Sequence, residues 1–160
     1  MTEENTHVDD RAVDRTAITD LLVAYAWALD GREWDLLGEV FTDPVALDYP
    51  VGFRSGPLAR CIDDFRVFHE VFDGTYHVMT NQHVTIDGDA ALMRAYAQGT
   101  LVKHGHPGGD NFAAGTYYTD SVVRVNGRWR IAERRMHVVW TMGNLELVNI
   151  GRRALAAASA

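Results

Sequence analysis

Residues 113–140 read AAGTYYTDSVVRVNGRWRIAERRMHVVW, and this stretch decides the fold class. Two runs rich in Val, Thr, Tyr and Ile flank the dipeptide Asn126-Gly127, which is a strong short-range signal for a two-residue hairpin turn. The stretch therefore predicts a long antiparallel hairpin with strands over 113–125 and 129–140.

Similar strand patterns precede this hairpin. The runs over 75–86 and 90–103 are rich in β-branched and aromatic residues, and the turn residues Asp87-Gly88 separate them. A short early strand is expected over 45–49, with Gly52-Phe53 as its partner. Because the long strands follow one another with short turns, the sheet is expected to be mostly antiparallel.

The first 73 residues show helical spacing instead. Apolar residues recur every three or four positions over 10–29, and Gly31 favours a helix end there. A short second helix is expected over 33–40 and a third over 57–72, with Pro in its first turn. Helices followed by long strands indicate an α+β fold, in which a curved sheet wraps around three N-terminal helices.

The composition is that of one ordered domain. The chain has 160 residues, of which 47% are hydrophobic and 23% are charged, and no repeat or linker divides it. Residues 1–160 are therefore expected to form a single domain. Loose ends are expected at about 1–8 and 150–160, where the tail RRALAAASA either frays or docks as a short helix.

Charge and hydropathy exclude several kinds of partner. The formal net charge is −7 and there is no basic run, so nucleic acid is not expected to bind. No stretch reaches about 18 apolar residues, and the start MTEENTHVDD lacks the features of a secretory signal, so we expect no membrane contact and a cytoplasmic location. The single cysteine, Cys61, allows no internal disulfide and is expected to be a buried, inert thiol.

Two residues have the chemistry of an acid–base pair. His77 lies on an expected strand, and an imidazole titrates near neutrality as a general base requires, although a purely structural histidine is the alternative. Asp30 ends the first helix, where it either reaches inward to orient a histidine or serves only the Asp-Gly turn. By strand alternation, Met79 and Asn81 share the face of His77.

Two other polar features bear on function. In Asp48-Tyr49 only one side chain can face inward, and we choose Tyr49, whose hydroxyl can donate a hydrogen bond in a pocket. The loop KHGHPGGD contains His104 and His106, but its glycines and proline, and the lack of a partner with ligand spacing, favour a solvated loop. We therefore expect no metal site.

The order of four segments resembles a known family. The segments are YAWALDGREWDLLGEVFTD, ALDY, YHVMTNQHVTIDGDAAL and GTYYTDSVVRVNGRWRIAERRMHVVW. Over about residues 10–142 the chain resembles the SnoaL-like group of the nuclear transport factor 2-like superfamily, which includes scytalone dehydratase and hexachlorocyclohexane dehydrochlorinase. The resemblance implies a cone-shaped, cystatin-like fold around an apolar cavity, and no cofactor.

The resemblance also implies site residues. In those enzymes an Asp after the first helix pairs with a His on the long strand after the third helix, and the matching positions here are Asp30 and His77. Tyr49 matches a substrate-orienting tyrosine. The chain departs from scytalone dehydratase at Leu29, where that enzyme has a second tyrosine, and at Tyr118, where it has an asparagine. The acid–base pair is kept, but the contacts that select one substrate are not.

The resulting hypothesis is a cofactor-independent lyase of the dehydratase type, acting on a small, largely apolar substrate that carries oxygen. An isomerase or polyketide cyclase with the same pocket is the first alternative. The β subunits of ring-hydroxylating dioxygenases resemble the chain as well, since they share the Asp, the His and an Asn four residues on, as in His77 and Asn81. A non-catalytic subunit is therefore the second alternative.

The pocket is expected to suit a flat aromatic, polyketide-like or steroid-like molecule. Its lining is expected to comprise Tyr25, Leu29, Phe53, Phe65, Phe68, Met79, Asn81, Tyr118 and Trp140. The strand around His77 has apolar residues on both faces, so we expect another protein surface to pack on its outer face as well. Because the resemblance implies dimers or trimers, we expect a homo-oligomer, and a trimer rather than a dimer.

Overall fold

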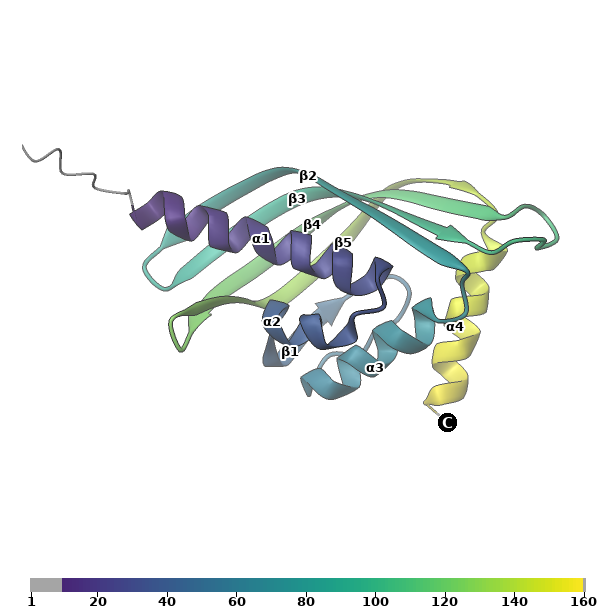
Figure 1. The fold of residues 1–160 in the computed structure, drawn as a ribbon, viewed down its shortest axis with the longest axis horizontal. Helices are drawn as coiled ribbons and strands as arrows, with labels where there is room; N and C mark the ends of the chain where they lie inside the picture. Colours follow the sequence, from purple (N-terminus) through teal and green to yellow (C-terminus); the bar gives the residue numbers. More distant parts are fainter. Residues whose placement is uncertain (1–9, 160) are drawn as a thin grey trace, which may run out of the picture.

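The computed structural model describes residues 10–159, which form one curved sheet with the helices packed on one of its faces (Figure 1). The helical elements are α1 (Asp10–Asp30), the 3-10 turn η1 (Trp34–Leu36), α2 (Leu37–Val40), α3 (Leu58–His69) and α4 (Glu146–Ala158). The strands are β1 (Phe41–Asp48), β2 (Gly74–Asp87), β3 (Ala90–Val102), β4 (Asn111–Val125) and β5 (Arg128–Gly143). The predicted α+β class is confirmed.

The sheet has the strand order β1-β5-β4-β3-β2. Strands β2 to β5 form an antiparallel series. Two-residue turns join β2 to β3 and β4 to β5, whereas the loop 103–110 joins β3 to β4. Both residues of the Asn126-Gly127 turn have positive φ. β1 pairs with β5 in parallel, at the edge of the sheet. The expected strand at Gly52-Phe53 is wrong, because β1 makes only a single bridge there, between Val45 and Gly56.

Helix α1 lies along the concave face of the sheet (Figure 1). Small side chains on β3, such as Ala95 and Ala97, leave room for it, and its own inner residues Ile18 and Leu22 are fully buried. Asp14 fixes the start of the helix, because its carboxylate accepts hydrogen bonds from Arg124 Nη2 at 2.7 Å and Trp129 Nε1 at 2.9 Å. α1 is thereby held against β4 and β5 at one end, while its other end reaches α3.

The C-terminal segment is ordered where a loose end was expected. Leu147, Val148 and Leu155 of α4 are buried, and the helix packs across α3. Gly151 allows this close approach, since a Cβ there would lie 2.4 Å from Cε2 of Phe68. Residues 150–158 therefore belong to the folded domain. The other expected loose end, at 1–8, lies outside the described residues.

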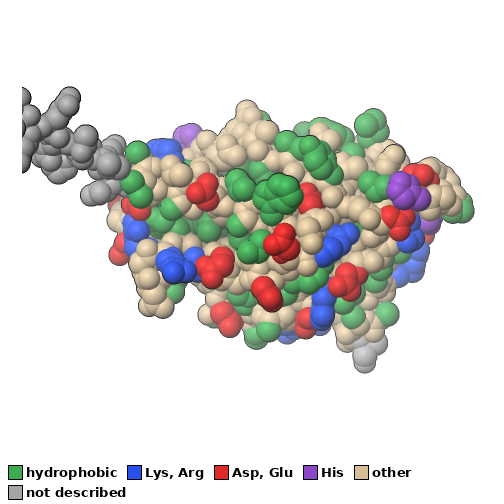
Figure 2. Space-filling view, in the orientation of Figure 1, with side chains coloured by type: hydrophobic (Ala, Val, Ile, Leu, Met, Phe, Trp, Pro, Cys, Tyr) green, Lys and Arg blue, Asp and Glu red, His purple; other side chains and the backbone are tan. Residues whose placement is uncertain are grey.

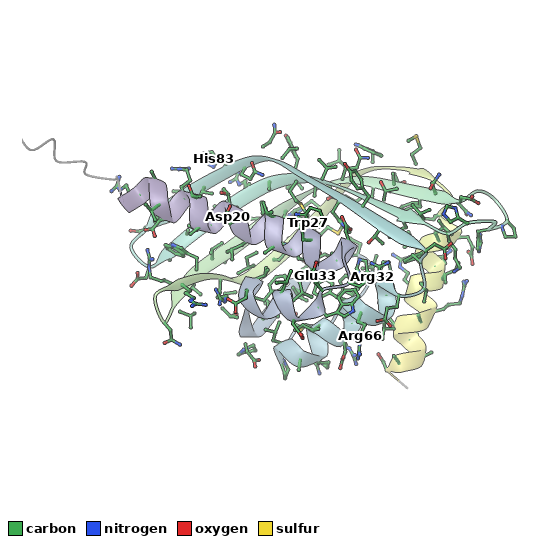
Figure 3. The ribbon with its side chains drawn as sticks, in the orientation of Figure 1. Asp20, Trp27, Arg32, Glu33, Arg66 and His83 are labelled. Atoms are coloured by element: carbon green, nitrogen blue, oxygen red, sulfur yellow. The ribbon has the colours of Figure 1, made fainter. Side chains whose placement is uncertain are left out.

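The surface that carries α1, α2 and α3 has acidic and basic side chains interspersed (Figure 2). Trp27 projects from the outer side of α1 (Figure 3) and is 64% exposed.

None of the helices within residues 10–159 combines the length and the apolar character needed to span a membrane.

Candidate functional site

A cavity of about 180 Å³ lies between the concave face of the sheet and helices α1, α3 and α4. Its wall is largely apolar, with Phe53, Phe68 and Phe112 on different sides. Leu145 and Val148 close it from the α4 end. A small number of polar side chains converge on this apolar space, which is the usual composition of a small-molecule site.

Asp30 and His77 are in contact at the wall of the cavity. Asp30 is the last residue of α1, and the start of β2 passes beside it. Asp30 Oδ1 lies 2.7 Å from His77 Nδ1, and Asp30 Oδ2 accepts a second hydrogen bond of 2.7 Å from the backbone N–H of His77. The carboxylate thus holds both the main chain and the ring of the histidine.

This contact determines the tautomer of His77. A carboxylate oxygen is only an acceptor, so Nδ1 of His77 carries the proton and Nε2 holds a lone pair. The ring lies over Gly99 on the neighbouring strand β3, where a Cβ would be 3.3 Å from Nε2. Both residues line the cavity, so the basic nitrogen is presented to a bound molecule.

Asp30 is itself positioned by a second set of hydrogen bonds. Thr75 Oγ1 donates to Asp30 Oδ1 at 3.0 Å, and Arg32 Nη1 donates to Thr75 Oγ1 at 2.9 Å. Arg32 lies where the end of α1 meets α3 (Figure 3), and its Nη2 also donates to the carbonyl of His69. Burial raises the pKa of Asp30, but the hydrogen bonds from His77 and Thr75 outweigh burial and lower it below its usual value. Asp30 is therefore ionised at neutral pH.

Three tyrosine hydroxyls form the other polar group of the cavity. Tyr25 and Tyr49 have their hydroxyl oxygens 3.0 Å apart, and the rings of Tyr25 and Tyr118 are 6.1 Å apart at their centres. Burial raises the pKa of all three. The hydroxyls therefore keep their protons at neutral pH and are able to donate hydrogen bonds to a carbonyl or another oxygen.

A buried ion pair lies behind these tyrosines. Arg134 and Asp120 are both fully buried, and the guanidinium makes two hydrogen bonds to the carboxylate, of 2.8 and 2.7 Å. The guanidinium carbon lies 4.5 Å from the ring centre of Tyr25 and 4.3 Å from that of Tyr118. Burial lowers the pKa of Arg134, but Asp120 outweighs it and keeps the guanidinium charged. A fixed positive charge next to the tyrosines favours negative charge developing on an oxygen that they bind.

The structure brings together seven of the twelve residues that the sequence proposed for the site. His77, Tyr49, Tyr25, Phe53, Phe68 and Tyr118 line the cavity. Asp30 lies directly behind His77. Within Asp48-Tyr49 the inward side chain is Tyr49, whereas Asp48 faces outward and binds Arg135.

Five of the proposed lining residues are corrected by the structure. Leu29 and Phe65 are fully buried in the core, and Met79 packs against that core without reaching the cavity. Asn81 lies at a bulge in β2 with φ at 55°, and the bulge reverses the alternation so that Val84 rather than His83 faces inward.

Trp140 lies outside the cavity because of a second irregularity, in the pairing of β5 with β4. The register of β5 shifts opposite Gly115 and Thr116, so that Val138 and Thr141 line the cavity. Trp140 is 44% exposed and covers Gly115 from the outer face, where a Cβ would lie within 2.1 Å of its Nε1. The prediction that Trp140 lines the cavity is therefore wrong.

Several residues of the site were not found from the sequence. His69 at the end of α3, Gly99 on β3 and the pair Asp120 and Arg134 had no distinguishing motif. The spacing of Thr75 and His77 on one strand face offered a signal for Thr75. The others depend on contacts between distant elements.

The remaining reactive side chains lie away from the cavity. Cys61 is buried, as predicted, and its Sγ donates to the carbonyl of Arg54 at 3.1 Å. Burial raises the pKa of its thiol, which favours the unreactive form. His104 is exposed in its loop, 3.6 Å from Asp110. Within residues 10–159, no group of three or more His, Cys, Asp or Glu side chains is arranged to hold a metal ion.

The chain belongs to the SnoaL-like domain family, whose pattern matches residues 10–135. A relative in Mycobacterium tuberculosis, the uncharacterized protein Rv2910c, is 33% identical over 129 residues, which cover 76% of this chain and 82% of the relative. Helix α4, which closes one end of the cavity, lies beyond the family match.

Two solved structures from Novosphingobium aromaticivorans share the fold. One, named as a candidate aromatic ring hydroxylase, is 28% identical with a TM-score of 0.74 and covers 86% of this chain and 97% of its own. The other, named as a candidate scytalone dehydratase, is 20% identical with a TM-score of 0.76 and covers 85% of this chain and 91% of its own. The expected nuclear transport factor 2-like, cystatin-like architecture is confirmed.

Proposed function

We propose that this protein is a cofactor-independent lyase that removes the elements of water, or of another small acid, from a small apolar substrate carrying oxygen. The observation that carries the proposal is the 2.7 Å contact between Asp30 and His77, which leaves the basic Nε2 facing an apolar cavity. Tyrosine hydroxyls provide hydrogen-bond donors in the same space. These are the parts that proton abstraction next to a carbonyl requires.

The proposed reaction has three coupled changes. His77 Nε2 takes a proton from the carbon next to the carbonyl, and the electrons of that C–H bond move toward the carbonyl oxygen. Tyr49, assisted by Tyr25, donates a hydrogen bond to that oxygen, while Asp30 stabilises the imidazolium. The electrons then return to form a C=C bond, the C–O bond to the leaving hydroxyl breaks, and the proton held by His77 completes the water molecule.

The size of the cavity restricts the substrate. An enclosed apolar cavity of about 150 Å³ is known to hold benzene, so the 180 Å³ here suits one substituted ring. A larger polyketide-like or steroid-like molecule would extend out of the mouth. We therefore favour an aromatic β-hydroxy ketone as the class of substrate.

The test uses a substrate panel and one general probe. Small aromatic β-hydroxy ketones are incubated with the protein, and mass spectrometry detects the loss of one water. Acetophenone in deuterium oxide reports proton abstraction alone, because NMR follows exchange at its methyl group even without a leaving group. If the protein accelerates neither reaction, the proposal is wrong.

Gly99 provides a test of the position of the base. In Gly99→Ala the new Cβ lies about 3.3 Å from Nε2 of His77, so the imidazole must shift by a few tenths of an ångström. We expect the exchange rate to fall about tenfold with little change in Tm, since small misplacements of a reacting group are costly. Gly74→Ala is the matched control, because a Cβ there meets no atom within 4 Å. An unchanged rate in Gly99→Ala would contradict the proposed geometry.

An isomerase or cyclase would use the same base and the same donors. Product analysis separates the two classes, since loss of water identifies a lyase and an unchanged mass identifies isomerisation or cyclisation. The likeness to a candidate aromatic ring hydroxylase supports a further alternative, a non-catalytic subunit of a ring-hydroxylating dioxygenase. Co-purification with an iron–sulfur oxygenase α subunit, together with no effect of changing His77, would favour that alternative.

We also infer that the chain forms a homo-oligomer, specifically a trimer. Large apolar side chains are exposed on the strands away from the helices, including Tyr76 at 61%, Tyr96 at 56% and Met142 at 68%. Light scattering at micromolar concentration is expected to give three times the monomer mass of 17.9 kDa. Tyr96→Glu should reduce this mass, whereas Val13→Glu on α1 should not. A mass near that of the monomer for the unmodified protein would refute the inference.

A further inference from the structure

A second histidine lines the cavity and takes no part in the proposed proton abstraction. His69 is the last residue of α3, it is 3% exposed, and its ring centre lies 6.1 Å from that of His77. The rings of Phe68 and Trp34 pack against it, with centres 5.2 and 6.2 Å away. The imidazole is therefore held in one orientation by its neighbours.

The hydrogen bond of His69 determines which nitrogen carries the proton. Nδ1 lies 2.6 Å from the carbonyl oxygen of Phe65, one helical turn earlier. A carbonyl can only accept, so Nδ1 is the donor and Nε2 holds a lone pair. His69 thus enters the cavity wall as a hydrogen-bond acceptor.

The free nitrogen of His69 opens onto the cavity. Nε2 makes no hydrogen bond to any residue within 10–159. Among the described residues, Arg134 Nη1 is the only buried side-chain nitrogen or oxygen that lacks a hydrogen-bond partner. Nε2 of His69 lacks a partner as well, so it is not a buried atom. Nε2 of His69 is therefore accessible, and the accessible space beside this ring is the cavity.

His69 remains uncharged over the whole working range of pH. Burial lowers its pKa to about 3, and repulsion from Arg32 and from the protonated form of His77 acts in the same direction, against Asp30 and the Phe65 carbonyl. A neutral imidazole whose only N–H is already engaged has no proton to give. His69 is consequently unable to protonate a leaving group, and its free nitrogen can only receive a hydrogen bond.

We propose that His69 is a substrate-contacting residue whose Nε2 accepts a hydrogen bond from a hydroxyl group of the ligand that is not the leaving group. The tyrosines donate to an acceptor oxygen of the ligand, and His69 requires a donor. The cavity therefore selects a ring that carries both a carbonyl oxygen and a retained hydroxyl, such as a phenolic ketone. That His69 contacts a substrate rests on the proposed lyase function, whereas the preference of the cavity for a ligand with a hydroxyl group does not.

The preference is tested with 4-methylphenol and toluene, which differ by one hydroxyl group. Calorimetry on the unmodified protein is expected to show 4-methylphenol bound about fivefold more tightly than toluene, the effect of one net hydrogen bond. In His69→Phe, which keeps an aromatic ring among its aromatic neighbours, this preference should fall to within about twofold. His83→Phe is the matched control and should keep the preference, because His83 is exposed on β2 and does not line the cavity.

A measurement on the unmodified protein guards against misfolding of the variant. Histidine side-chain ¹⁵N spectra should show His69 as the Nδ1–H tautomer from pH 8 to pH 5, and 4-methylphenol, but not toluene, should shift its Nε2 signal. The inference is overturned if the preference is kept in His69→Phe, if 4-methylphenol leaves Nε2 unshifted, or if the unmodified protein binds neither probe. Failure of the lyase proposal is recognised separately, by deuterium exchange that does not depend on His77.

Discussion

His77→Ala is expected to lower the rate of deuterium exchange into acetophenone by about 10²–10⁴-fold, the contribution of a positioned general base. The reason is that Nε2 of His77 is the basic nitrogen that Asp30 holds ready at the cavity wall. Asp30→Asn should cause a comparable loss, because an amide in place of the carboxylate no longer fixes the tautomer or stabilises the imidazolium.

His83→Ala is the control for these two variants. His83 is exposed on the same strand, beyond the bulge and toward the start of α1 (Figure 3). Its substitution should therefore leave the exchange rate unchanged. Rates of His77→Ala and Asp30→Asn within about threefold of the unmodified protein, against the loss expected of a base, would show that the pair only supports the fold.

Arg134→Met is expected to lower the free energy of unfolding by about 3–5 kcal/mol. The substitution leaves the carboxylate of Asp120 fully buried and without its partner, and desolvation of an unpaired charge is costly. Urea unfolding measures the change. A loss below about 1 kcal/mol, the range of an exposed ion pair, would show that water reaches Asp120.

The double variant Asp120→Leu with Arg134→Met separates stability from function. Replacing both buried charges by apolar side chains removes the unpaired group, so most of the lost stability should return. The exchange rate should nevertheless stay below that of the unmodified protein, because the positive charge next to Tyr25 and Tyr118 is gone. A full recovery of the rate would assign the ion pair a purely structural role.

Local sequence patterns predicted most of the elements. The helical spacing before residue 73, the turns at Asp87-Gly88 and Asn126-Gly127, and the strand composition after residue 74 all correspond to observed elements. These signals are short-range, since turn conformations and helix ends depend on a few consecutive residues. The parallel pairing of β1 with β5 joins residues some 90 positions apart, and no local pattern predicts it.

Two of the wrongly predicted lining residues, Asn81 and Trp140, lie where the alternation along a strand is interrupted. Thr75 and His77 precede the bulge of β2, and His77 points into the cavity, whereas Asn81 lies in the bulge and turns away. Trp140 follows the irregularity in β5 and faces outward for the same reason. A bulge shifts every later side chain to the opposite face, and its position depends on the partner strand.

The sequence by itself determined the fold class and the family, and it singled out Asp30 and His77 as a candidate pair. The fold class follows from composition and turn chemistry, and the family and the pair follow from the order of short segments that resembles the family. Only the tertiary structure decided the tautomer of His77, the entry of His69 into the cavity, the buried pair of Asp120 and Arg134, and the closure of the cavity by α4. Each of these depends on atoms from elements far apart in the chain meeting within hydrogen-bond or van der Waals distance, and such meetings are fixed by packing.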